Sequence, residues 1–136
     1  MRLLSLIALL ALGGAGYVYW TQQNALTPMA QAAEPLSRYE KLARCAALHG
    51  ALDDAMDTQG KSMLERLANK AFEEVFLFAA KSDQTRGDRN ETAVTGEITA
   101  LKAKYATAST AHVKGDRTEL ITRDIAHCSD LKAVLG

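Results

Sequence analysis

The chain has 136 residues, with 16 Lys plus Arg against 16 Asp plus Glu, and its formal net charge is zero. This balance argues against a nucleic-acid partner, because binding to phosphate needs a basic excess gathered on one face. Aromatic residues make up only 6% of the chain and there are two prolines, whereas Ala, Leu and charged residues are abundant. The composition therefore predicts an all-α protein.

The first segment, residues 1–23, has the pattern of a leader that targets the chain to a membrane. Residues 3–20 carry no charge, and a helix of that length spans about 27 Å, close to the hydrocarbon thickness of a bilayer. Arg2 precedes this apolar run, and no Lys or Arg follows it until Arg38. The positive-inside rule then places the N-terminus in the cytoplasm and the rest of the chain in the periplasm or outside the cell. We expect a single-pass protein of the inner or plasma membrane.

Two fates of the leader remain open at this point. Small residues at 13–16 suit a signal peptidase, and cleavage there would release a soluble periplasmic or secreted protein. The apolar run, however, continues through Tyr17, Tyr19 and Trp20. These side chains are typical of the interfacial belt at the end of a membrane-spanning helix. The aromatic residues favour an uncleaved signal anchor.

A retained leader would also have a surface for a partner in the membrane. Ala11, Gly14 and Ala15 form a stripe of small residues, on which another membrane helix can pack closely. The same small residues are also typical of the end of a signal peptide. The stripe therefore predicts contact with subunits of a membrane protein complex only if the leader stays.

The remainder of the chain is predicted to be a tether followed by one helical domain. Residues 24–35 contain both prolines and have no apolar periodicity, which predicts a tether. Over residues 36–136, apolar positions recur every three or four residues, which predicts amphipathic helices. Short connections between them favour an antiparallel up-down four-helix bundle. The expected helices lie at 36–56, at 62–81, between an exposed loop at 82–90 and Gly115, and after Thr118.

The apolar positions of each helix predict which face turns toward the core. On the first and last helices these faces include Cys45 and Cys128, respectively. The second helix is expected to bury Leu64, Leu67, Ala71, Val75, Phe78 and Ala79, with Phe72 and Phe76 broadening this face. The third is expected to bury Val94, Ile98, Leu101, Tyr105 and Ala108.

The two cysteines, Cys45 and Cys128, are predicted to form one disulfide. The first and last helices are neighbours in a closed four-helix bundle, and an exported protein meets an oxidising compartment. Such a bridge stabilises the fold by about 4 kcal/mol in the chain-entropy estimate. Free thiols and a zinc site with His49 and His127 are the alternatives. Zinc is disfavoured because His127 points about 100° away from the adjacent Cys128 around the helix.

His49 and Gly50 form the remaining candidate site. Gly in the middle of a helix costs about 1 kcal/mol relative to Ala. Either the close packing of another helix or a bound ligand would account for it, and both interpretations remain open. The sequence has no haem-attachment motif, phosphate-binding loop or nucleophile elbow, so we predict no cofactor, no metal and no catalytic residue.

These patterns favour a non-catalytic, membrane-anchored accessory or interaction subunit of a larger membrane protein complex, with its helical domain outside the cytoplasm. The alternative is a cleaved, soluble periplasmic or secreted helical module that binds a small ligand or metal. An enzyme is a third hypothesis, since catalytic residues far apart in sequence can converge in space without a motif.

Overall fold

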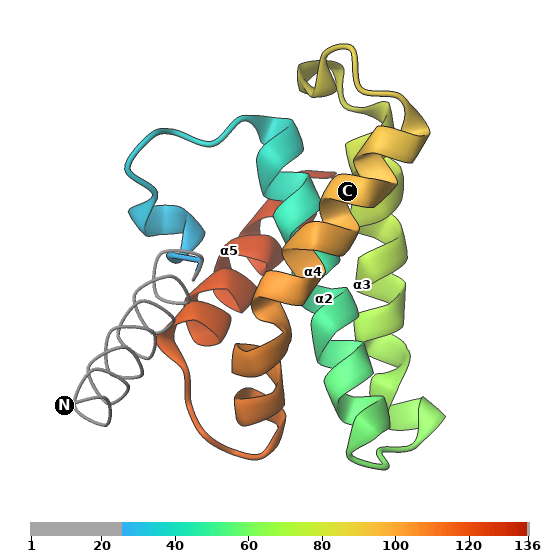
Figure 1. Ribbon diagram of the computed structural model, residues 1–136, viewed down its shortest axis with the longest axis vertical. Coiled ribbons are helices and arrows are strands. Elements are labelled where there is room, and N and C mark those ends of the chain that lie inside the picture. The colour runs from blue at the N-terminus through green and yellow to red at the C-terminus, as the bar shows by residue number, and fades with distance from the viewer. Residues whose placement is uncertain (1–25, 136) are drawn as a thin grey trace, which may run out of the picture.

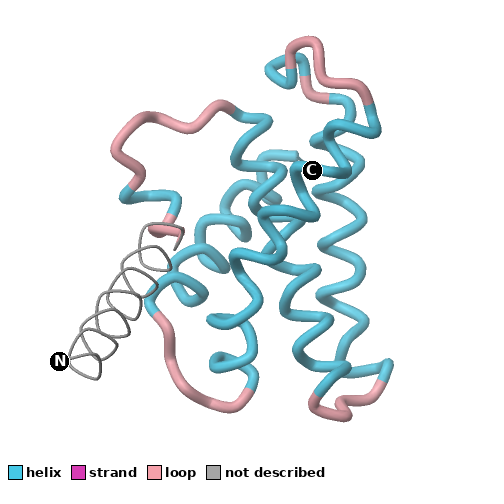
Figure 2. Tube along the Cα trace, viewed as in Figure 1, coloured by secondary structure: helices cyan, strands magenta, loops and turns pink. Residues whose placement is uncertain are grey.

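The computed structural model describes residues 26–135, and every element in this range is helical (Figures 1 and 2). The prediction of an all-α domain with four α-helices is confirmed. The α-helices are α2 (Arg38–Thr58), α3 (Met63–Ser82), α4 (Glu91–Val113) and α5 (Glu119–Leu135), and two 3-10 helices, η1 (Met29–Gln31) and η2 (Gln84–Arg86), lie outside them.

The expected membrane helix lies outside the described residues. Among residues 26–135, no helix combines the length and the apolar character needed to cross a bilayer. The predicted small-residue stripe and interfacial belt also lie outside the described range. Their residues are Ala11, Gly14 and Ala15 for the stripe, and Tyr17, Tyr19 and Trp20 for the belt.

Two capping boxes start the first helical hairpin. The Ser37 side chain accepts a hydrogen bond from the Glu40 N–H, and the Glu40 carboxylate accepts one from the Ser37 N–H. Ser62 and Glu65 make the same pair of bonds at the start of α3, so both helices begin at satisfied N-termini. Gly60, in the turn between α2 and α3, has a φ of 75°, a conformation that disfavours residues with a side chain.

The helix α2 occupies the centre of the bundle. Every residue from 42 to 53 is buried, and most of them are small or apolar, so other elements can cover α2 on nearly every side. Both α3 and α4 pack extensively along α2, whereas α3 and α4 make few contacts with each other. Figure 1 shows α4 crossing over α2 while α3 runs alongside it. The helical bundle is confirmed, but α2 lies at its centre and not in the ring of neighbours that an up-down topology predicts.

The prediction for the buried face of α3 is confirmed only in part: Phe76 is buried, and Phe72 and Ala79 pack against the core. The other five expected core residues lie on the outer surface, with Leu64 81% and Phe78 75% exposed. The inner face carries Phe76 together with polar side chains, because α2 presents the buried His49 and Asp53 and buried polar groups need hydrogen-bonding partners. We call the outward-facing set the α3 stripe: Leu64, Leu67, Ala71, Val75 and Phe78.

The predictions for α4 and α5 are confirmed. Val94, Ile98 and Tyr105 are buried, and Ile121 and Cys128 are fully buried on α5. The partly buried Leu101, Ala108, Ile125, Leu131 and Leu135 pack against the same core.

The described part of the expected tether, residues 26–35, contains an element that packs on the bundle. The helix η1 contacts α5, and Met29 is only 5% exposed. Figure 1 shows this segment beside α5 before the chain rises to the start of α2.

Candidate functional site

The predicted disulfide joins α2 to α5. Cys45 and Cys128 are bonded with their Cα atoms 5.6 Å apart, and both residues are fully buried. Because each sulfur is held in the bridge, neither thiol is available to zinc. Among the described residues, no group of three or more His, Cys, Asp or Glu side chains is arranged to hold a metal ion.

A buried polar cluster lies beside the disulfide and links the same two helices to α4. Arg44 Nη2 donates to Asp124 Oδ2 at 2.9 Å, and their side chains are 8% and 1% exposed. The Tyr105 hydroxyl donates to the same Asp124 oxygen at 2.6 Å and accepts from Arg44 Nε at 3.0 Å. Burial, with the charge of Asp124, raises the pKa of Tyr105, so the phenol keeps its proton. We call these three residues the Arg44–Tyr105–Asp124 cluster.

The Arg44–Tyr105–Asp124 cluster also fastens the segment before α2. The Met29 N–H donates to Asp124 Oδ1 at 2.8 Å, and Arg44 Nη2 donates to the Thr27 carbonyl at 2.7 Å. Both carboxylate oxygens of Asp124 are therefore engaged, as a buried ion pair requires. From Thr27 onward, the chain is held at a defined place on the bundle.

His49 is held within the core. Its Nδ1 lies 2.9 Å from Asn69 Oδ1, and the Asn69 amide nitrogen faces Met56 Sδ at 3.3 Å. The imidazole lies 4.9 Å from the Phe72 ring and stacks on the Phe76 ring at 5.9 Å, measured between ring centroids. Burial lowers the pKa of His49. The neutral ring therefore donates its Nδ1 proton to Asn69 and acts as a packed core group.

Two side chains cross α2 at Gly50. A Cβ on Gly50 would lie 2.9 Å from Glu73 Oε1 and 3.3 Å from Lys102 Cε. Glu73 comes from α3 and Lys102 from α4, and their charged groups are 3.9 Å apart. Close approach of these side chains accounts for glycine at this position.

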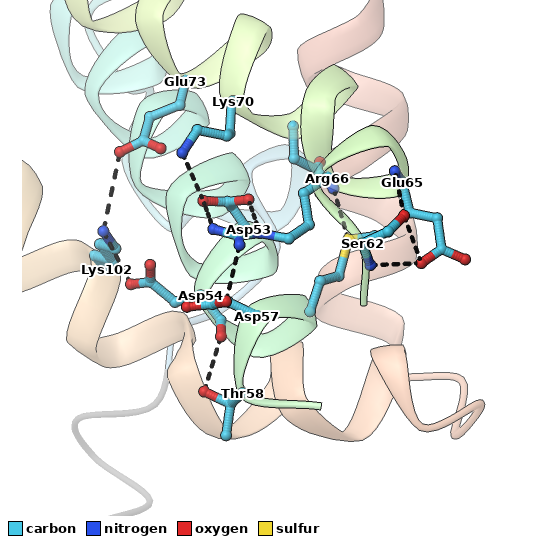
Figure 3. Close-up of polar contacts among 12 residues, drawn as sticks. Asp53, Asp54, Asp57, Thr58, Ser62, Glu65, Arg66, Lys70, Glu73 and Lys102 are labelled. Atoms are coloured by element: carbon cyan, nitrogen blue, oxygen red, sulfur yellow. Dashed lines mark hydrogen bonds and ion pairs between the residues drawn. The ribbon is translucent and has the colours of Figure 1, made fainter. Parts of the chain in front are cut away.

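The crossing at Gly50 belongs to a charged network at the C-terminal half of α2 (Figure 3). Arg66 donates to Asp53 through Nε at 2.9 Å and Nη2 at 3.2 Å, and to Asp57 through Nη1 at 2.8 Å. Lys102 Nζ lies 3.0 Å from Asp54. Burial lowers the pKa of Lys102, but the hydrogen bond with Asp54 and the negative charges of Asp54, Glu73 and Asp53 together outweigh this, and the net shift is upward. These charges pair with one another and tie α3 and α4 to α2.

A cleft of about 390 Å³ lies between helices α2 and α4 and the segment that precedes α2, which contributes Leu26 and Leu36. At its edge the Tyr39 hydroxyl donates to the Glu97 carboxylate, which also accepts from Arg89 Nε at 2.8 Å. Burial and the bond to Glu97 raise the pKa of Tyr39 to about 12, and the same bond lowers the pKa of Glu97. The apolar lining is formed by Leu26, Leu36, Ala43, Ala100 and Leu101.

The α3 stripe is the most prominent apolar feature of the described surface. Six large apolar side chains are exposed in residues 26–135, and five of them lie on α3. Four of these five belong to the α3 stripe, and Met63, 57% exposed, extends it at the N-terminal end. Contiguous apolar surface of this kind marks an interaction site more often than isolated exposed residues do. The sequence showed the periodicity of the stripe but not the direction in which it points.

Comparison with known proteins identifies no relative. No protein family, no characterised protein and no solved structure matches this chain.

Proposed function

We propose that the protein is a non-catalytic, membrane-anchored accessory subunit of a larger membrane protein complex, with its helical bundle outside the cytoplasm. In this proposal residues 1–23 are retained as the anchor, and the bundle binds within the complex through the α3 stripe. The exposure of the α3 stripe is the observation that carries the proposal.

The α3 stripe has the form of a helix-docking surface. Its residues extend over about 21 Å of one helix face, from Leu64 to Phe78 at about 1.5 Å per residue. Their exposed fractions run from 41% for Val75 to 81% for Leu64. Burying apolar surface stabilises a complex by about 25 cal/mol per Å² before the costs of association. Apolar residues three and four apart are the anchors by which helices are recognised.

Two further features support the location and the mode of attachment. A buried disulfide suits an oxidising compartment outside the cytoplasm. The bonds from Thr27 and Met29 to the Arg44–Tyr105–Asp124 cluster hold the chain that follows the leader against the bundle. The chain that follows a retained anchor would thus be attached to the bundle at a defined point. Such an attachment suits a subunit with one orientation in a complex.

Co-purification of the full chain from its native membranes tests this proposal. We expect partner subunits in a fixed ratio with the wild-type chain and their loss with Leu67→Glu, which places a charge in the α3 stripe. Thr107→Glu, at an exposed position on α4, should retain the partners. The intact mass in the membrane fraction should match the full sequence. A shortened chain in the soluble fraction, or partners that stay with Leu67→Glu, would contradict the proposal.

The cleft beside the N-terminal segment favours a second candidate, a cleaved, soluble helical module that binds a small apolar ligand. Its volume of about 390 Å³ falls in the range of small-molecule sites, about 300–1,000 Å³. The cavity that borders His49 holds only about 130 Å³. Ala100→Trp would fill the cleft and should abolish binding of an apolar fluorescent probe to the soluble protein, whereas Thr107→Trp should not. Equal binding by both variants would remove this candidate.

A further inference from the structure

We infer that the partner covering the α3 stripe is a second copy of this chain, packed antiparallel across α3. The inference rests on the proposed function, because it names the occupant of the docking surface proposed above. Three features of α3 carry it: the spacing of the stripe, the small residues at its centre and the charges on one flank.

The spacing of the α3 stripe is the same in both directions. From Leu64 to Phe78 the steps are three, four, four and three residues, with Ala71 at the midpoint. A twofold axis beside Ala71 would therefore place Leu64 opposite the partner's Phe78. The same axis would place Leu67 opposite the partner's Val75. Such self-complementarity is what a closed, isologous interface between two copies requires.

The α3 stripe has small side chains in its middle and large side chains at its ends. Ala71 and the neighbouring Ala68 are both exposed, and their methyl groups are the only side-chain atoms there. Small side chains at the contact allow two helix axes to approach toward the short end of the usual 8–10 Å range. The bulky Leu64 and Phe78 then lie at opposite ends, where each meets the large residue of the other copy.

The charges on one flank of the stripe are complementary in this arrangement. Lys70 and Glu74 are one helical turn apart and lie on the same side. Antiparallel pairing turns this flank toward the same flank of the other copy. Glu74 is three residues beyond the axis and the partner's Lys70 is one residue beyond it toward the same end, so the two are offset by about 3 Å along the helix.

Neither charge is committed to a strong bond within its own chain. Glu74 makes no ion pair within residues 26–135 of its chain, and the closest carboxylate oxygen to Lys70 Nζ is Asp53 Oδ2 at 4.0 Å. Two symmetric Lys70–Glu74 pairs can therefore form between the copies. They would fix the antiparallel register while the apolar residues supply the burial.

Cysteine cross-linking of the full chain in intact cells tests the inference. Ala71→Cys lies at the twofold axis and should give a cross-linked dimer on oxidation, whereas Thr107→Cys on α4 should stay monomeric. Leu64→Cys and Phe78→Cys should cross-link when the two chains are expressed together. Neither should cross-link alone, because in an antiparallel pair each residue lies about 21 Å from its own copy along the helix.

The outcomes separate this inference from the proposed function. Self-cross-linking of Leu64→Cys would signal a parallel dimer and overturn the antiparallel arrangement. If Ala71→Cys stays monomeric while Leu67→Glu loses fixed-ratio partners, the second copy is overturned and the proposed function stands. If Ala71→Cys stays monomeric and Leu67→Glu loses nothing, both are overturned. Circular dichroism of each variant should match the wild type, because all the substituted positions are exposed.

Discussion

The backbone N–H of Met29 donates a hydrogen bond to Asp124 at 2.8 Å, although 95 residues separate them in the chain. The carboxylate of Asp124 serves two partners at once, since its other oxygen pairs with Arg44. The segment before α2 is therefore fastened by the same ion pair that joins α2 to α5. Loss of Asp124 should weaken both attachments together.

We predict that Asp124→Ala lowers the free energy of unfolding by about 3–5 kcal/mol, because it leaves the buried Arg44 guanidinium without a counter-charge. Tyr105→Phe removes two hydrogen bonds and no charge, so its cost should be smaller, about 1–3 kcal/mol. Asp130→Ala, at an exposed position on α5, serves as the control. Urea denaturation measures all three.

Amide hydrogen exchange measures the hydrogen bond between Met29 and Asp124 directly. The Met29 amide should lose protection in Asp124→Ala and keep it in Asp130→Ala. If Asp124→Ala is as stable as the wild type, or if its Met29 amide keeps its protection from exchange, the segment is held by something other than this cluster.

We predict that removing the disulfide with Cys45→Ala and Cys128→Ala lowers the free energy of unfolding by about 4 kcal/mol. The bridge closes a loop with a sequence separation of 83, and a loop of this length restricts the unfolded chain strongly. The wild type in strong reductant should approach the stability of the double variant. Alkylation before and after reduction should differ by two thiols. Equal stability with and without reductant would contradict a structural role for the bridge.

Parts of this structure were predictable from sequence because local periodicity and burial agree there. On α4 and α5 the apolar positions face the core, so a helical period identifies Ile98 or Ile121 directly. The disulfide followed from an even cysteine count and from the inward faces of the first and last helices. The buried faces follow from one helix at a time, and the disulfide needs in addition only that the first and last helices are neighbours.

The remaining features depend on which helices meet. The α3 stripe is as periodic as the faces of α4 and α5, yet it points outward because the opposite face of α3 supplies partners to His49 and Asp53. The central place of α2 follows from burial on nearly every side, which leaves no single apolar face to read. Arg44 and Asp124 are 80 residues apart. Their only signal is position: Arg44 precedes Cys45, and Asp124 lies one turn before Cys128.

We predict that stability falls on acidification below about pH 6.5 and that His49 contributes to this fall. Burial lowers the pKa of His49 in the folded protein, so the unfolded chain binds the proton first as pH drops below the ordinary value near 6.5. The stabilising contribution is therefore complete above that pH and is lost as the pH falls toward the folded-state pKa. The slope attributable to one such group is at most about 1.4 kcal/mol per pH unit.

His49→Asn isolates this contribution, because asparagine can still donate to Asn69 but does not titrate. Unfolding free energies measured between pH 5 and pH 8 should show a flatter profile for His49→Asn than for the wild type. His127→Asn, on the partly exposed side of α5, is the matched control. If His49→Asn keeps the wild-type slope, acid sensitivity comes from other groups.

We predict that charge reversal at Lys70 in one chain and at Glu74 in another favours the mixed dimer of the two variants over the dimer of either variant with itself. In a dimer of Glu74→Lys chains, two Lys–Lys contacts replace two Lys–Glu contacts. In a dimer of Lys70→Glu chains, two Glu–Glu contacts replace them. Exposed pairs are worth about 0.2–1 kcal/mol each, so each variant should self-associate about tenfold more weakly than the wild type. The mixed pair has both ion pairs restored and should recover wild-type affinity.

Co-expression of the two chains with different tags, followed by pull-down of one tag, measures this selectivity. Recovery of the mixed pair with little of either like pair is the expected result. Lys104→Glu on α4 and Asp130→Lys on α5, both exposed, control for a general change in net charge and should leave self-association unchanged. Rescue in the mixture requires residues 70 and 74 of different chains to meet, so its absence in a protein that still dimerises would place the contact elsewhere.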